Sequence, residues 1–70
     1  MKLRDLMSQL GLAQTDENLW QNYDGSILVA QLPEGEVILS RLNDENLVSV
    51  RFCRFDRSIG ALLESWMSLV

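Results

Sequence analysis

Residues 23–52, YDGSILVAQLPEGEVILSRLNDENLVSVRF, decide the fold because three apolar runs follow one another with turn residues between them. The turn signals are DG at 24–25, PEG at 33–35 and NDEN at 43–46. Glycine supplies a positive φ, proline presets φ at the second position of a turn, and Asn and Asp bond to their own backbone. The first of these signals predicts a two-residue hairpin turn. The stretch therefore predicts successive antiparallel hairpins.

Four strands are expected from this pattern, at residues 19–23, 26–32, 36–42 and 47–55. The last is rich in β-branched and aromatic residues, which favour strands. Because each strand follows its neighbour through a short turn, the predicted sheet is a four-stranded antiparallel meander. The polar segment before the first strand, AQTDEN at 13–18, is predicted to be a loop.

Helical spacing of apolar residues occurs on both sides of the predicted sheet. The stripes are Leu3, Leu6, Met7 and Leu10 in the first helix, and Ile59, Leu62, Leu63, Trp66, Met67 and Val70 in the second. Gly11 stands where a left-handed C-terminal cap belongs, and Leu12 could complete the hydrophobic contact of that cap. Asp56 or Ser58 would cap the start of the second helix, whose water-facing side would include Gly60. We predict a single α+β domain over residues 1–70: an N-terminal helix, the meander sheet and a C-terminal amphipathic helix.

Size and charge limit the possible partners. A chain of 70 residues supplies a core worth only about 3–5 kcal/mol, so association with a partner subunit is a serious possibility. Six basic residues against ten acidic ones give a net charge of −4. Nucleic-acid binding depends on Lys and Arg neutralising phosphates, so no nucleic-acid partner is expected.

The location is predicted from what the sequence lacks. The single cysteine, Cys53, cannot form an internal disulfide, and residues 1–13 lack the pattern of a signal peptide. No apolar run approaches the roughly 20 residues needed to span a membrane. We therefore expect a cytoplasmic protein without a membrane partner.

No catalytic chemistry is expected. The chain has no histidine, which excludes Ser-His and Cys-His pairs and histidine-containing zinc sites. Six carboxylates fall in predicted turns or loops: Asp16, Glu17, Asp24, Glu34, Asp44 and Glu45. Their spacing fits neither a calcium loop nor a catalytic pair, and there is no glycine-rich phosphate loop. We predict no enzyme activity and no catalytic, cofactor or metal site.

Cysteine and arginine leave two questions open in the fourth predicted strand. Cys53 is either a small buried hydrophobe, the commoner case, or a half-exposed thiol. Four arginines lie in or just after the last two predicted strands: Arg41, Arg51, Arg54 and Arg57. They either pair with nearby carboxylates on a solvated surface, which we favour, or form a basic patch, and arginine is also enriched at protein interfaces.

Apolar residues occupy more than one face of the predicted sheet. In the fourth strand Val48, Val50 and Phe52 share a face that is expected to be core. The second and third strands are apolar on both faces. If the two helices lie on the same side, the other side exposes aliphatic residues and needs a partner; if they lie on opposite sides, the protein is a self-contained monomer. We favour the first arrangement and predict a partner surface formed by Leu28, Ala30, Ile38, Leu47, Arg51 and Phe55.

The order of these elements resembles the class I type III secretion chaperones of bacteria. The resemblance rests on four stretches: LMSQLGL at 6–12, YDGSILVAQL at 23–32, GEVILSRL at 35–42 and LLESWMSLV at 62–70. It implies a non-enzymatic, acidic homodimer that holds an extended segment of a client protein and keeps it competent for export. This chain is shorter than the usual family member, and we do not expect it to contain the strands and helix through which those chaperones commonly dimerise. The alternative is a small adaptor or inhibitor, of the kind encoded by phages or plasmids, that docks on a folded host protein.

Overall fold

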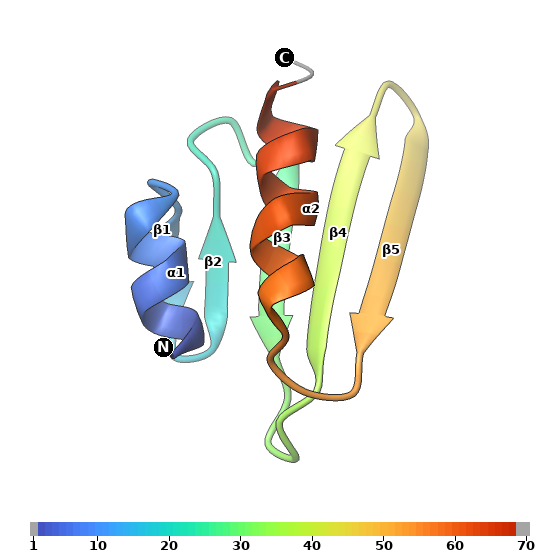
Figure 1. Cartoon of the computed structure of the whole chain (residues 1–70). Coiled ribbons are helices and arrows are strands. Elements are labelled where there is room, and N and C mark those ends of the chain that lie inside the picture. Colours follow the sequence, from blue (N-terminus) through green and yellow to red (C-terminus); the bar gives the residue numbers. More distant parts are fainter. Residues whose placement is uncertain (1, 69–70) are drawn as a thin grey trace.

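The computed structural model describes residues 2–68 and shows an antiparallel sheet with a helix at each end of the chain (Figure 1). The elements are α1 (Leu3–Gln9), β1 (Ala13–Asp16), β2 (Leu19–Gln21), β3 (Ile27–Gln31), β4 (Val37–Asn43), β5 (Asn46–Phe52) and α2 (Arg57–Ser68). The strands lie in the order β1-β2-β3-β4-β5 and each pairs antiparallel with the next. The predicted α+β class and meander are confirmed. The predicted number of strands was wrong, because the sheet has five rather than four.

The additional strand is β1, in the segment that was predicted to be a loop. Gln14 pairs with Trp20 in β2, and the register shifts between Gln14 and Asp16. All four residues of β1 are exposed. A short edge strand with both faces in water carries no apolar alternation, so its sequence is indistinguishable from that of a polar loop.

The turn between β2 and β3 is longer than predicted. Asn22 donates its N–H to the Ile27 carbonyl at 3.2 Å, and Gly25 donates to the Asn22 carbonyl at 3.1 Å. Gly25 has the expected positive φ, +76°. The predicted strand to Tyr23 therefore stops at Gln21, and five residues connect the two strands.

The two later turns agree with the sequence. Gly35 has φ +101° after Pro33, and Asp44 has φ +57° in a two-residue turn closed by the pair Asn43 and Asn46. The strand after this turn ends at Phe52 rather than at the predicted residue 55.

Both helix caps have clear physical causes. At the end of α1, Gly11 (φ +78°) donates its N–H to Ser8 and Leu12 donates to Met7 at 2.9 Å, which is the Schellman arrangement. Leu12 is buried, as the cap requires. At the start of α2, the Asp56 carboxylate accepts the N–H of Ser58 at 2.8 Å, so Asp56 rather than Ser58 is the N-cap. Val70, the last residue of the predicted second stripe, lies outside the described residues.

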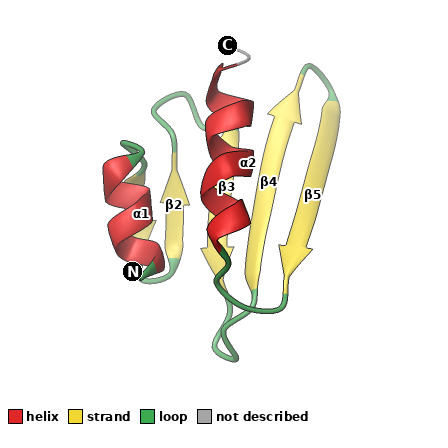
Figure 2. Ribbon diagram, in the orientation of Figure 1, coloured by secondary structure: helices red, strands yellow, loops and turns green. Residues whose placement is uncertain are grey.

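Both helices lie on the same face of the sheet (Figures 1 and 2). The core between them and the sheet consists of Leu3, Met7, Leu12, Trp20, Ile27, Val29, Val37, Leu39, Ile59, Leu63 and Trp66. These strand residues alternate along β3 and β4, so their neighbours point to the other face. The arrangement with one helix on each face was wrong, and no helix of residues 2–68 covers the other face of the sheet (Figures 1 and 2).

Gly60 lies in the contact between the two helices. It is buried, although its spacing placed it on the water-facing side of the helix. A Cβ atom built on Gly60 would meet the Leu6 side chain of α1 at 3.3 Å. Helix α1 therefore covers a side of α2 that the sequence pattern assigns to solvent.

Candidate partner-binding face

The uncovered side of the sheet, which we call the open face, is defined by strand register. In one row across the sheet, Leu19 pairs with Ala30, Ala30 with Ile38, and Ile38 with Arg51. Residues two positions apart on a strand share a face. On strands β2 to β5 the open face thus comprises Leu19, Gln21, Leu28, Ala30, Ile38, Ser40, Leu42, Leu47, Ser49 and Arg51.

The centre of the open face is a narrow apolar band. Leu19, Ala30 and Ile38 form one row, and Leu28 lies beside Ala30 on the same strand. All four are half-buried, since neighbouring side chains on a sheet cover one another even where no other layer lies above them. Leu19, Ala30 and Ile38 lie on three adjacent strands about 4.8 Å apart, so the band is about 10 Å long.

Polar side chains border this band toward β5. The hydroxyl groups of Ser40 and Ser49 are 3.1 Å apart on paired positions. Arg51 Nε lies 3.3 Å from Glu36 Oε2. This carboxylate oxygen is shielded from solvent, yet the contact lacks hydrogen-bond geometry, so it is an ion pair alone. The Arg51 side chain is largely exposed, and such a pair contributes only about 0–1 kcal/mol.

A second apolar pair lies at the end of the β4–β5 hairpin. Leu42 and Leu47 are partners in the register, and their exposed fractions are 52% and 68%. Leu42 was not among the predicted site residues. Counting outward from the two-residue turn pairs it with Leu47, so the sequence contained the signal that identifies it.

The predicted partner residues divide into two groups. Five of them lie together on the open face: Leu28, Ala30, Ile38, Leu47 and Arg51. Phe55 does not, because it follows β5 and packs against the core from the helix side. It is half-buried there, and its contacts are those of a structural residue.

The fourth predicted strand also differs from expectation on its helix side. Val50 and Phe52 pack against the core as predicted, whereas Val48 is 48% exposed. Figure 1 shows the reason: α2 lies over β3, and β5 extends beyond the helical layer. Cys53, just after β5, is exposed, so of the two alternatives for this residue the structure shows the exposed thiol.

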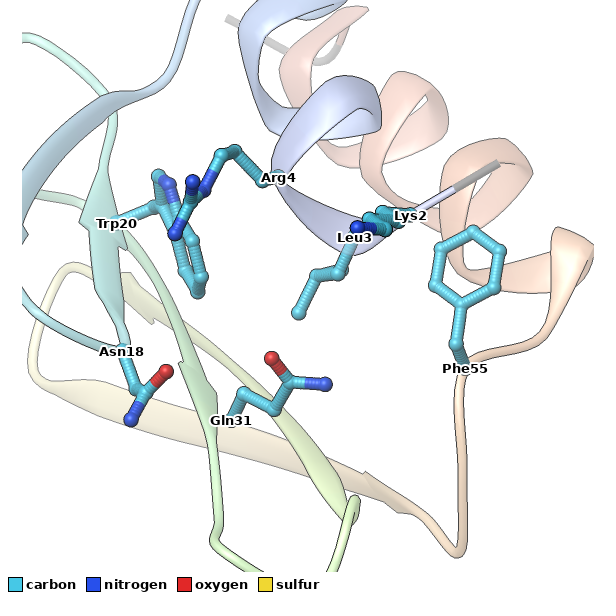
Figure 3. A pocket seen from close by; sticks show the side chains of 7 residues that line it. All are labelled: Lys2, Leu3, Arg4, Asn18, Trp20, Gln31 and Phe55. Carbon is cyan, nitrogen blue, oxygen red and sulfur yellow. The ribbon is translucent and has the colours of Figure 1, made fainter.

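A cavity of about 330 Å³ lies at the N-terminal end of α1 (Figure 3). Its lining residues are Lys2, Leu3, Arg4, Asn18, Trp20, Gln31 and Phe55. Figure 3 shows Arg4 beside Trp20 on one side and Phe55 on the other. The lining has two cations, two amides and two aromatic rings, but no carboxylate, thiol or hydroxyl side chain that could act as a nucleophile or general base.

Two carboxylates accept hydrogen bonds from a nearby serine. The N–H and hydroxyl of Ser58 hold the pKa of Asp56 below its usual value, and the N–H and hydroxyl of Ser26 do the same to the pKa of Asp24. Both groups stabilise a cap or a turn through these bonds.

Among residues 2–68, no group of three His, Cys, Asp or Glu side chains could hold a metal ion. Within the same residues, neither helix is both long and apolar enough to cross a bilayer.

Comparison with protein-family models, with curated proteins and with solved structures gave no match for this chain. The resemblance to secretion chaperones therefore stays a prediction, and the functional argument depends on the open face itself.

Proposed function

We propose that this protein is a non-enzymatic, cytoplasmic protein-binding module whose open face holds an extended segment of a client protein, in the manner of a secretion chaperone. The observation that carries the proposal is the uncovered sheet face with Leu28, Ala30 and Ile38 at its centre. Apolar side chains that lie together on an uncovered face and are rimmed by polar residues often mark a binding surface.

The shape of the apolar band supports an extended client. Gln21 and Ser40 flank Leu28 on its two sides in the neighbouring row, so the band is only one to two side chains wide. An extended segment crossing the strands can place alternate side chains on such a band, because successive residues of an extended chain point to opposite sides. A folded partner would need a broader contact, commonly about 800 Å² on each protein.

The chemistry of the ends of the band indicates the kind of segment. Arg51 lies at one end of the row that runs through Ile38, and its guanidinium is more exposed than its Glu36 partner. An arginine at the rim of an interface can donate two hydrogen bonds to a client carboxylate. We therefore expect client segments with apolar residues at alternate positions and an acidic residue near one end. The acidic charge of the protein as a whole disfavours nucleic acid as the partner.

Selection from a library of short random peptides tests the proposal without a known client. Peptides with alternating apolar residues should be recovered, and Ile38→Glu should abolish their binding because a charge would replace one of the apolar side chains of the band. Tyr23→Glu adds the same charge to an exposed loop residue outside the open face and should leave binding unchanged.

Circular dichroism of both variants confirms that the fold is retained. Recovery of no peptide, or of peptides that bind the Ile38→Glu variant equally well, would overturn the proposal. A folded host protein captured through the same face would replace it with the adaptor or inhibitor function.

A further inference from the structure

The two edges of the sheet are protected to very different degrees. At one edge, β1 has four residues, a register shift and only exposed side chains, and these features discourage further strand pairing. At the other edge, β5 has seven residues, NLVSVRF, with one charge, no proline and no register shift. An edge of this second kind favours pairing with another strand.

The main-chain groups available at this edge follow from the register. Leu42 donates its N–H to the Ser26 carbonyl at 2.8 Å, so this N–H points away from β5. Leu42 and its partner Leu47 are therefore a non-hydrogen-bonded pair of the β4–β5 ladder. Bonding alternates along an antiparallel pair. Leu47, Ser49 and Arg51 therefore direct their N–H and C=O groups outward, where no strand within residues 2–68 meets them.

We propose that β5 pairs antiparallel with β5 of a second copy about a two-fold axis at Ser49, which joins the two sheets into one. Ser49 is the midpoint of β5, so this register pairs all seven residues. In this register the outward-directed N–H and C=O groups of Ser49 in the two copies face each other, as a hydrogen-bonded antiparallel pair requires.

Side-chain chemistry selects the same register. Arg51 lies opposite Leu47 of the second copy, whereas an axis at Arg51 would bring two guanidinium groups together. On the helix side Val48 faces Val50 of the second copy, which covers the exposed half of a valine that α2 does not reach. Cross-strand pairs of β-branched residues stabilise sheets. A single self-complementary strand thus meets the requirement of a two-fold interface.

This pairing deepens the proposed function without depending on it. The two open faces become one continuous surface across the axis, so a client segment could contact both copies. Dimer formation concerns the edge of β5 and client binding concerns the face of the sheet, so either can fail while the other stands.

Sedimentation velocity over a wide concentration range tests the dimer. The full chain should approach twice its 8.0 kDa mass at high concentration. Ser49→Pro should stay monomeric, because proline lacks the outward N–H and is tolerated on an edge strand where that N–H does not bond within the sheet. Gln14→Pro places proline on the opposite edge strand and should still dimerise. A wild-type chain that is monomeric throughout, or a dimer that persists in Ser49→Pro, would overturn the proposal.

Cross-linking tests the register and covers the case in which Ser49→Pro fails to fold. In a Cys53→Ser background, Ser49→Cys should form an intermolecular disulfide on mild oxidation, since facing Cα atoms would be about 5.5 Å apart. Leu47→Cys should not, because its two copies would be separated by four residues along the strands, about 13 Å. Equal cross-linking of both variants, or none of either, would contradict an axis at Ser49.

Discussion

Leu6 of α1 lies directly over Gly60 of α2: a Cβ atom at Gly60 would be 3.3 Å from Leu6 Cδ1. The two helices approach closely because residue 60 has no side chain. Both helices bury their apolar side chains against the same face of the sheet, and the open face exists because neither helix of residues 2–68 lies on the other side (Figure 1).

A large side chain at Gly60 should separate the helices. We expect Gly60→Leu to lower the free energy of unfolding by about 1–3 kcal/mol, the usual cost of overpacking. Ala61→Leu introduces the same good helix former at an exposed neighbouring position and should change stability by less than about 0.5 kcal/mol. Urea denaturation followed by circular dichroism measures both. Equal effects of the two substitutions would show that α1 does not pack on Gly60.

Adjacent residues of β4 should report opposite faces of the sheet. Leu39 is fully buried under the helices, so Leu39→Ala should cost about 2–5 kcal/mol. Ile38 lies on the open face and is only half-buried, so Ile38→Ala should cost about 1 kcal/mol, of the order of a strand-propensity difference. Thermal or urea unfolding of the two variants gives the comparison. A larger loss for Ile38→Ala would mean that something covers the open face within the same chain.

Much of this architecture is predictable from the sequence because its signals are local. The turns at Gly35 and Asp44, the cap at Gly11 and the alternation of β3 and β4 each follow from a few neighbouring residues. Strand β1 was missed because pairing alone, without apolar burial, holds it in the sheet. The positions of Gly60 and Phe55 depend on where a helix from the other end of the chain packs, and periodicity within one segment cannot supply that information.

The same distinction applies to the candidate site. Its five residues on the open face could be assigned because a strand has only two faces and the helices cover one of them. Leu42 was recoverable from the turn, whereas the exposure of Val48 was not. That exposure depends on how far α2 reaches across the sheet, which is a property of the packed structure.

The two-residue turn between β4 and β5 should be sensitive to substitution at one position only. Asp44 has φ +57°, a conformation that β-branched residues rarely adopt. Asp44→Val should therefore destabilise the protein by about 1–2 kcal/mol. Glu45→Val removes the same charge at a residue whose φ is not positive and should have a smaller effect. Comparison of the two melting temperatures is the measurement, and a greater loss for Glu45→Val would contradict the turn geometry.

Stability should depend on pH through Asp56 and Asp24. Their pKa values are lowered in the folded protein because serine N–H and hydroxyl groups donate to the charged carboxylates. A lowered folded pKa means that this stabilisation is fully present above the unfolded value of about 3.9 and is lost as pH falls through the folded pKa. Asp56→Asn keeps an N-cap that does not titrate, so in this variant the free energy of unfolding should fall less steeply as the pH is lowered.

The control for this pH dependence is Glu64→Gln, which removes one negative charge from an exposed position of α2 away from the cap. Urea denaturation at a series of acidic pH values should show that the free energy of unfolding depends on pH in this variant as it does in the unsubstituted protein. If the free energy of unfolding of Asp56→Asn depends on acidic pH as steeply as that of the unsubstituted protein, the cap does not contribute to this dependence.

The most direct test of the central claim is methyl NMR of the full chain titrated with a peptide selected from the random library. Binding to the open face should shift the methyl signals of Leu28, Ile38 and Leu47, and leave those of Ile59 and Leu63 in the helix-covered core unchanged. The claim would be contradicted if the methyl signals of Leu3, in the cavity beside Phe55, shifted while those of the open face stayed unchanged.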